Sequence, residues 1–304
     1  MQDTYGFLWI ATTDGLGRFD GQDLVQFRYN PRDTNTLGNN VIMDLELDTA
    51  GNILVSTRNG WSVFMQEENK FLNFIGDPTS TTTGNSDIIH HTIQDQSGNY
   101  WYGTYNGLFL KPGLDQANKK ILPDKNRLPQ LSRDNVWQIH EDQKGRIWVG
   151  SGDGLILVEQ GDSLSFQLFS HRDHAVHGLR AHQVWSFAEH TDGRLWIGTS
   201  QGVYQIEELE GNIHFTQAMP SILKDIYVNT LYLDRDSILW VGTYDRGLYA
   251  WSLVSNQLSH YQHRPGEETG LSLDQIKTIF RDQNETLFVG AGGAIDFSNP
   301  KMNR

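Results

Sequence analysis

The chain has 304 residues, no cysteine and a formal net charge of −13. The lack of cysteine excludes disulfides, thiolate metal sites and cysteine nucleophiles, and the acidic charge disfavours nucleic acid and anionic membranes as partners. No apolar run is long enough to span a membrane, so direct membrane insertion is not expected, and Met1–Gly6 lacks the basic and apolar parts of a signal peptide.

The first predicted elements set a pattern that returns along the chain. Asp3–Gly6 is typical of a tight turn, because an Asp side chain can bond the backbone two residues on and Gly accepts positive φ. Leu8–Thr12 is rich in residues that favour pleated strands, and Gly15-Leu16 and an aromatic strand at Leu24–Tyr29 follow it. We name these strands b, c and d. Strand a, which should precede the turn, is missing from this first repeat.

The Trp of strand b recurs at a nearly constant interval. Its slot falls at residues 9, 54, 101, 148, 196, 240 and 288, in steps of 44 to 48 residues, with Leu54 and Phe288 in place of Trp. Seven repeats of this length, each with four short strands, predict an all-β chain that forms a seven-bladed β-propeller of four-stranded antiparallel blades. We expect residues 1–304 to form this single domain, with no helix longer than two turns.

The last repeat ends near Asp296–Ser298 without a strand d, so both terminal blades are expected to be incomplete in this chain. Because bare strand edges are usually avoided, we expect the chain to be part of a longer protein. Strand b carries a small residue after its apolar core, and we expect it to permit close approach of the next blade at Gly103, Gly150, Gly198 and Gly242.

Three segments resemble the two-component regulator propeller repeat, namely Gly6–Gly21, Asp142–Leu155 and His190–Val203. The connectors Asn30–Leu37 and His263–Leu273 are similar to the blade-to-blade connection of that family. The resemblance implies the first propeller of a periplasmic sensor, followed by a second propeller and a membrane-linked output domain such as a histidine kinase or diguanylate cyclase. A cytoplasmic location is the alternative, and a homodimer of the full receptor is left open.

The sequence shows no enzyme signature: it has no phosphate loop, no nucleophile elbow and no paired-His zinc helix. We therefore expect a non-catalytic ligand sensor without a cofactor or metal. The alternatives are a propeller enzyme of the lyase or glycosidase type, or a protein-binding scaffold. His90 and His91 are neighbours on a strand and face opposite sides, so they cannot share a metal. Asp234–Asp236 is interpreted as a turn and not as a calcium site.

A ligand is expected at the end of the blades where the b–c and d–a loops meet, because the b–c tips vary on a constant scaffold. Tyrosines there suit a sugar face, and arginines suit a carboxylate, so the expected ligand is a small molecule or glycan. As the alternative, the arginines pair with Asp14, Asp153 or Asp245. The candidate ligand-binding residues are Arg58, Tyr105, Asn106, Trp137, Trp185, Tyr244 and Arg246. Arg133, Asp134, Arg180 and His182 also arrive on d–a connections.

One connector holds four histidines, His171, His174, His177 and His182. We interpret it as a solvated loop, with a pH-responsive or ligand-contacting loop as the alternative.

Overall fold

The computed structural model describes residues 1–76, 88–122, 128, 135–161, 163–217, 224–235, 237–266 and 270–298. The chain is a seven-bladed β-propeller of antiparallel sheets; the first and last sheets have three strands and the other five have four. This topology confirms the all-β class, the number of blades and the incomplete terminal blades predicted from the repeat. Within the described ranges the helices are η2 (His171–Asp173) and α1 (His174–His177), and neither could cross a membrane.

The chain divides into two compact units, Met1–Gly152 with Leu157–Gln167, and Asp153–Ile156 with Leu168–Arg304. The sheets of the first unit comprise β1 (Leu8–Thr12), β2 (Gly15–Phe19) and β3 (Leu24–Phe27); β4 (Ile42–Leu47), β5 (Ile53–Thr57), β6 (Trp61–Met65) and β7 (Lys70–Phe74); and β8 (Ile89–Gln94), β9 (Tyr100–Thr104), β10 (Gly107–Lys111) and β11 (Lys119–Lys120).

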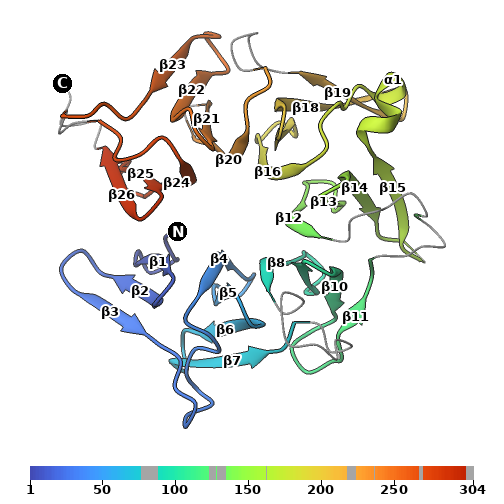
Figure 1. Cartoon of the computed structure of the whole chain (residues 1–304). Coiled ribbons are helices and arrows are strands. Elements are labelled where there is room, and N and C mark those ends of the chain that lie inside the picture. Colours follow the sequence, from blue (N-terminus) through green and yellow to red (C-terminus); the bar gives the residue numbers. More distant parts are fainter. Residues whose placement is uncertain are drawn as a thin grey trace. The chain divides into compact units, whose positions relative to one another are not determined.

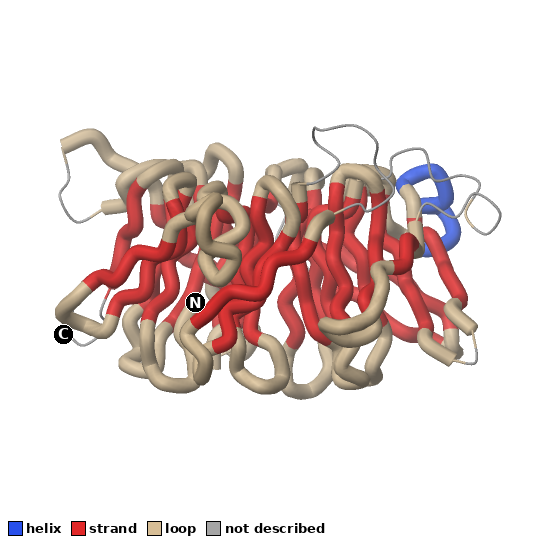
Figure 2. Tube along the Cα trace, turned by 90° about the horizontal axis from the view of Figure 1, so that it is seen from below, coloured by secondary structure: helices blue, strands red, loops and turns tan. Residues whose placement is uncertain are grey.

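The residues of the fourth sheet are divided between the units, and its strands are β12 (Val136–Glu141), β13 (Ile147–Ser151), β14 (Gly154–Glu159) and β15 (Ser165–Phe169). The second unit contains β16 (Val184–Glu189), β17 (Leu195–Thr199), β18 (Gly202–Leu209) and β19 (Asn212–Gln217); β20 (Val228–Leu233), β21 (Ile238–Thr243), β22 (Leu248–Ser252) and β23 (Leu258–Tyr261); and β24 (Ile276–Arg281), β25 (Leu287–Ala291) and β26 (Ala294–Ser298). Figure 1 labels these strands, and Figure 2 shows the turns gathered at the two ends of the strands.

The a–b turns are joined to strand b by a buried hydrogen bond. In four blades the indole Nε1 of the strand-b Trp donates to the Asp that opens the turn, over 2.7–2.8 Å: Trp9 to Asp3, Trp101 to Asp95, Trp148 to Asp142 and Trp240 to Asp234. These residues are therefore structural, and Asp234 is a turn residue as predicted. Asp236 lies outside the described residues.

Apolar side chains fill the space between neighbouring sheets. In the first unit, Leu54 and Trp61 of the second sheet pack with Ile89 and Tyr102 of the third. In the second unit, Trp196 packs with Val228 of the following sheet. The strands are thus held by burial of large apolar surfaces between blades, as the repeat architecture requires.

The small residue of strand b lies where the next blade comes closest. A Cβ atom added to Gly103 would lie 2.4 Å from Cγ1 of Val136, and one added to Gly198 would lie 2.7 Å from Cγ1 of Val228. Gly242 meets Ile276 in the same way, at 2.6 Å. The prediction of close approach at these three positions is confirmed.

Candidate functional site

The b–c tips are fixed by the Thr that ends strand b. Its hydroxyl donates to the carbonyl of the following Gly, as from Thr104 to Gly107 (3.2 Å) and from Thr243 to Gly247 (2.7 Å). The same hydroxyl accepts the backbone N–H of a tip residue, Asn106 in one blade and Arg246 in another. The repeated Thr and Gly therefore hold a rigid turn on which the intervening side chains can vary.

Strand a brings a second group of side chains to these tips through a β-bulge. Its pairing with strand b shifts register at the second residue in blades two to seven. A bulge re-aims the side chain of the extra residue and is frequent beside functional sites. The bulge residues are Met43, His90, Trp137, Trp185, Asn229 and Lys277.

The first aromatic cluster joins blades three and four. The ring of Tyr105, at the b–c tip of blade three, lies 4.4 Å from the ring of His90 and 5.5 Å from that of Trp137. His90 and Trp137 are themselves 4.7 Å apart. Tyr105 remains 39% exposed, so the cluster is open to solvent on one side. Sequence analysis named Tyr105 and Trp137, and the structure adds His90 between them.

His90 keeps this cluster uncharged at neutral pH. Burial lowers its pKa from about 6.5 to about 4, because the charged imidazole loses its hydration. Its Nε2 atom is buried and forms no hydrogen bond with any residue in the described ranges. The cluster thus offers aromatic faces and a neutral imidazole to a ligand.

The second aromatic cluster belongs to blades five and six. The ring of Trp185 lies 5.7 Å from that of Tyr227, which lies 6.0 Å from that of Tyr244. The hydroxyl of Tyr227 donates to Gln183 Oε1, and the backbone N–H of Tyr244 donates to the Tyr227 carbonyl. Tyr244 is 54% exposed. The structure therefore links the predicted Trp185 and Tyr244 through Tyr227, which sequence analysis did not name.

The two predicted arginines are exposed on b–c tips, and within the described residues no ion pair neutralises them. Neither Arg58 nor Arg246 forms an ion pair with any residue in the described part of the chain, and Asp14 pairs with Arg28 instead. Within the described residues, the alternative in which these arginines pair with Asp14, Asp153 or Asp245 is therefore not observed. The candidate Asn106 is half-buried on the tip beside Tyr105. Arg133 and Asp134 lie outside the described residues.

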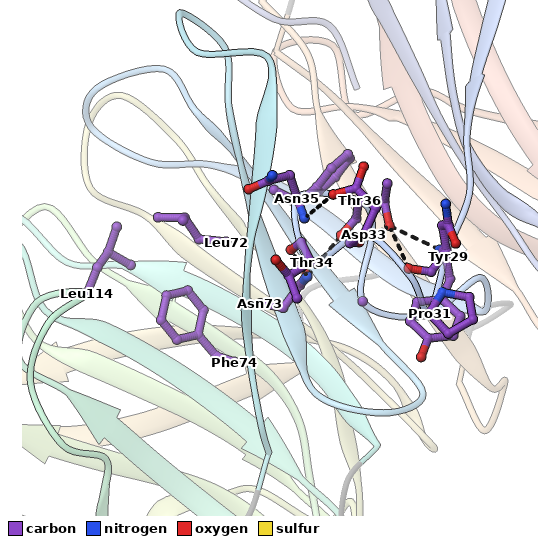
Figure 3. Close-up of a pocket in the computed structure, with 13 residues that line it drawn as sticks. Tyr29, Pro31, Asp33, Thr34, Asn35, Thr36, Leu72, Asn73, Phe74 and Leu114 are labelled. Atoms are coloured by element: carbon purple, nitrogen blue, oxygen red, sulfur yellow. Dashed lines mark hydrogen bonds between the residues drawn. The ribbon is translucent and has the colours of Figure 1, made fainter.

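A groove of about 590 Å³ lies where the connector Tyr29–Thr36 folds against β7 (Figure 3). Its polar groups are bonded within the protein. Asn73 Nδ2 donates to the Thr36 carbonyl over 2.9 Å, and the Phe71 N–H donates to the Asn35 carbonyl over 2.8 Å. These bonds give the connector a structural role, so we do not place the ligand in this groove.

The histidine-rich connector is partly buried. His177 is 7% exposed, and its ring lies 5.5 Å from Phe169 and 5.6 Å from Phe215. The Leu179 N–H donates to His177 Nδ1 over 3.2 Å. The solvated-loop interpretation is wrong for His177, because the two aromatic rings enclose it, whereas His174 is exposed.

His90 was missed because it was considered only with its neighbour His91 and not by its place in the repeat, and Tyr227 was not considered at all. When the repeats are aligned, His90, Trp137 and Trp185 occupy the same slot, the second residue of strand a. Alignment of that position across the repeats would have placed His90 with the two predicted tryptophans. Tyr227 directly precedes β20, and no comparable pattern marks it.

Comparison with known proteins gives matches of two kinds. The family model described as two component regulator propeller matches residues 130–153, 178–201 and 222–245. Each match runs through strand a, the a–b turn and strand b of one blade. Comparison with curated proteins finds no match.

Several solved structures share the fold. The extracellular domain of a protein described as the hybrid two component system BT3049 from B. thetaiotaomicron is 22% identical, with a TM-score of 0.78 over 98% of this chain and 39% of its own. The extracellular domain of BT4673 from the same organism is 23% identical, with a TM-score of 0.75 over 98% of this chain and 37% of its own. A streptogramin B lyase is 12% identical, with a TM-score of 0.69 over 98% of this chain and 92% of its own. The chain thus spans about two fifths of the two extracellular domains.

Proposed function

We propose that this chain, which the two component regulator propeller model matches at residues 130–153, 178–201 and 222–245, is the extracytoplasmic, ligand-sensing propeller of a bacterial signal-transduction receptor and is not itself catalytic. Its partners in this proposal are a small-molecule or glycan ligand, a second propeller and a membrane-linked output domain. The similar extracellular domains of BT3049 and BT4673 support this context. The periplasm is the compartment that fits such a receptor.

The two aromatic clusters carry the proposal of ligand binding. Each combines an exposed tyrosine on a fixed b–c tip with a tryptophan on a bulge, and rings of this kind offer flat apolar area at low entropy cost. Arg246 lies on the same tip as Tyr244, Arg58 lies on the tip of blade two, and neither guanidinium group is ion-paired within the described residues. Either cluster fits a saccharide, and beside Tyr244 the guanidinium group of Arg246 would bind a carboxylate on that saccharide.

Thermal unfolding of the chain against a panel of neutral and acidic oligosaccharides tests the proposal, followed by calorimetry on each hit. Tyr105→Ala and Tyr244→Ala should each weaken binding roughly two- to tenfold, since one stacked ring contributes about 0.5–1.5 kcal/mol. Arg246→Ala should weaken binding of acidic saccharides alone. Tyr5→Ala is the matched control, because Tyr5 is an exposed tyrosine on an a–b turn.

Three outcomes would contradict the proposal. Unchanged affinity in both tyrosine variants would remove the clusters from the binding site. Cleavage of a bound saccharide, seen by mass spectrometry, would favour the rival enzyme of the lyase or glycosidase type. A stop codon directly after residue 304 in the gene would argue against a receptor, which requires a membrane helix and an output domain further on.

A further inference from the structure

A second group of polar side chains lies on the first strands of blades two and three. β4 and β8 run side by side (Figure 1) and bring Asp44 and Glu46 together with His91. His91 Nε2 lies 3.4 Å from Asp44 Oδ2 and 3.5 Å from Glu46 Oε1. Across the described ranges this is the one group of three His or acidic residues whose ligand atoms lie within 4.8 Å of one another.

His91 is buried in this group, and its imidazole forms long ion pairs with both carboxylates. Its side chain is 5% exposed, and among the residues that the structure describes no partner lies in close hydrogen-bond geometry with either ring nitrogen. The Oδ2 atom of Asp44 is also buried and unbonded within those ranges. Buried polar atoms are nearly always closely hydrogen-bonded, so an imidazole held 3.4–3.5 Å from two carboxylates leaves space for a ligand shared by all three groups.

The two separations are long for a direct ion pair and match the spacing of ligands around an ion. A charged imidazole and a carboxylate in direct contact close to about 2.7–2.9 Å, which is shorter than either distance observed here. A tetrahedral ion with bonds of about 2.0–2.2 Å holds its ligands roughly 3.3–3.6 Å apart. The separations of His91 from Asp44 and from Glu46 fall in that second range.

The ligand chemistry selects the class of metal. Imidazole suits Zn²⁺ and its first-row neighbours, whereas Ca²⁺ and Mg²⁺ prefer ligand sets made of oxygen alone. The side chains of Asp44 and Glu46 are 34% and 46% exposed, so an ion can enter and keep open positions for water. The amino group of Met1 lies near both carboxylates, but it donates its hydrogen bond to the Trp9 carbonyl over 3.1 Å.

We propose that Asp44, Glu46 and His91 form a binding site for a divalent transition-metal ion, with Zn²⁺ as the ion that best fits the ligands and their spacing. The site joins neighbouring blades of the first unit, since two ligands come from β4 and the third from β8. A bound ion would cross-link these strands. It would also present an open coordination position, to which an anionic group can bind.

Calorimetry with ZnCl₂ tests the site, using the full chain freed of any histidine tag and stripped with a chelator, at about pH 7. The wild type should bind about one ion per chain, and its melting temperature should rise. His91→Gln, Asp44→Asn and Glu46→Gln should each weaken binding at least about tenfold. Co²⁺ should give an absorption spectrum that His91→Gln abolishes.

His90→Gln is the matched control, because His90 is the next residue on β8 and packs in the aromatic cluster instead. It should bind Zn²⁺ as the wild type does. If the buried His91→Gln variant fails to fold, the half-exposed Glu46→Gln variant decides. The proposal is overturned if the wild type shows no saturable binding, or if every ligand variant binds as tightly as the wild type.

Discussion

At the scale of single residues, His177 shows how packing fixes a protonation state. Its ring lies between Phe169 and Phe215, and its Nδ1 accepts the Leu179 N–H. Burial lowers the pKa of His177, and the opposing charge of Asp173 does not offset this effect. Protonation would place a hydrogen on Nδ1 and break the bond from Leu179. The folded chain therefore keeps this imidazole neutral.

Lowering the pH should weaken the fold through His177. The unfolded chain takes up a proton near pH 6.5, whereas the folded chain does so only at lower pH, so the free energy of unfolding should begin to fall near pH 6.5 and continue falling below it. Urea denaturation from about pH 7.5 to about pH 5 measures this. His177→Gln should reduce the pH dependence, and the exposed His174→Gln should not. Equal pH dependence in wild type and His177→Gln would contradict the argument.

Blade five lacks the Asp that binds the strand-b indole elsewhere. His190 occupies that slot, and the Nε1 of Trp196 is buried without a partner in the described ranges. In blade four, Asp142 accepts from both Trp148 Nε1 and Arg146 Nε, over 2.8 and 2.7 Å. The two blades are thus a natural comparison of the same turn with and without its acceptor.

His190→Asp should therefore stabilise the chain. The new carboxylate would accept the Trp196 indole N–H and lie beside Arg194, which already stacks over the Trp196 ring at 5.3 Å. We expect a gain of about 1 kcal/mol in the free energy of unfolding, measured with urea. The reverse change in blade four, Asp142→His, should cost about 1–3 kcal/mol. A neutral or destabilising effect of His190→Asp would show that the indole bond does not decide the stability of this turn.

At the scale of the elements, the close approach of neighbouring blades depends on a glycine in strand b at Gly103, Gly198 and Gly242. Gly103→Ala should destabilise the chain by about 1–3 kcal/mol, because the new Cβ would lie 2.4 Å from Val136 Cγ1. Gly161→Ala is the control, since its nearest neighbour would be the Ser163 carbonyl oxygen at 3.8 Å. The double variant with Val136→Ala should recover part of the loss, because both changes act on one contact. Purely additive losses would refute this explanation.

The elements were predictable from sequence because each is short and repeats the same local chemistry. The spacing of the Trp slot predicted the position of strand b, and the Asp and Gly residues predicted the turns on either side of it. The bulge in strand a was not predictable, since it appears only as a shift in pairing between Ile89 and His91 and at equivalent positions. This shift gives His90 and His91 different surroundings, with His90 among aromatic rings and His91 against two carboxylates.

The candidate metal site was missed for a related reason. Asp44 and His91 are 47 residues apart, one repeat length, so they occupy the same slot in neighbouring blades. Sequence analysis tested His90 with His91 as adjacent residues and found that they face apart. Partners on the neighbouring strand appear only when strand a of one blade is placed beside strand a of the next.

At the scale of the whole molecule, the net charge is strongly negative, and several arginine side chains already form ion pairs. Arg28 pairs with Asp14, Arg146 with Asp142 and Arg281 with Asp234. The exposed Arg58 and Arg246 can still bind a small anion, because salt screens the rest of the charge beyond about 8 Å at physiological ionic strength. An extended polyanion is repelled more strongly than a small anion, because many carboxylates of the chain act on it at once.

The chain should therefore not bind nucleic acid, although it can bind a small acidic ligand. Non-specific DNA binding depends on lysine and arginine displacing counterions along the phosphate backbone, and a net charge of −13 opposes it. Fluorescence anisotropy of a short labelled duplex should show no saturable change at about 50 mM salt, where electrostatic binding is favoured over that at higher salt. Adding Zn²⁺ should not alter this, because one ion changes the net charge by only two units. Saturable DNA binding that weakens with salt would reveal a basic surface and contradict the argument from net charge.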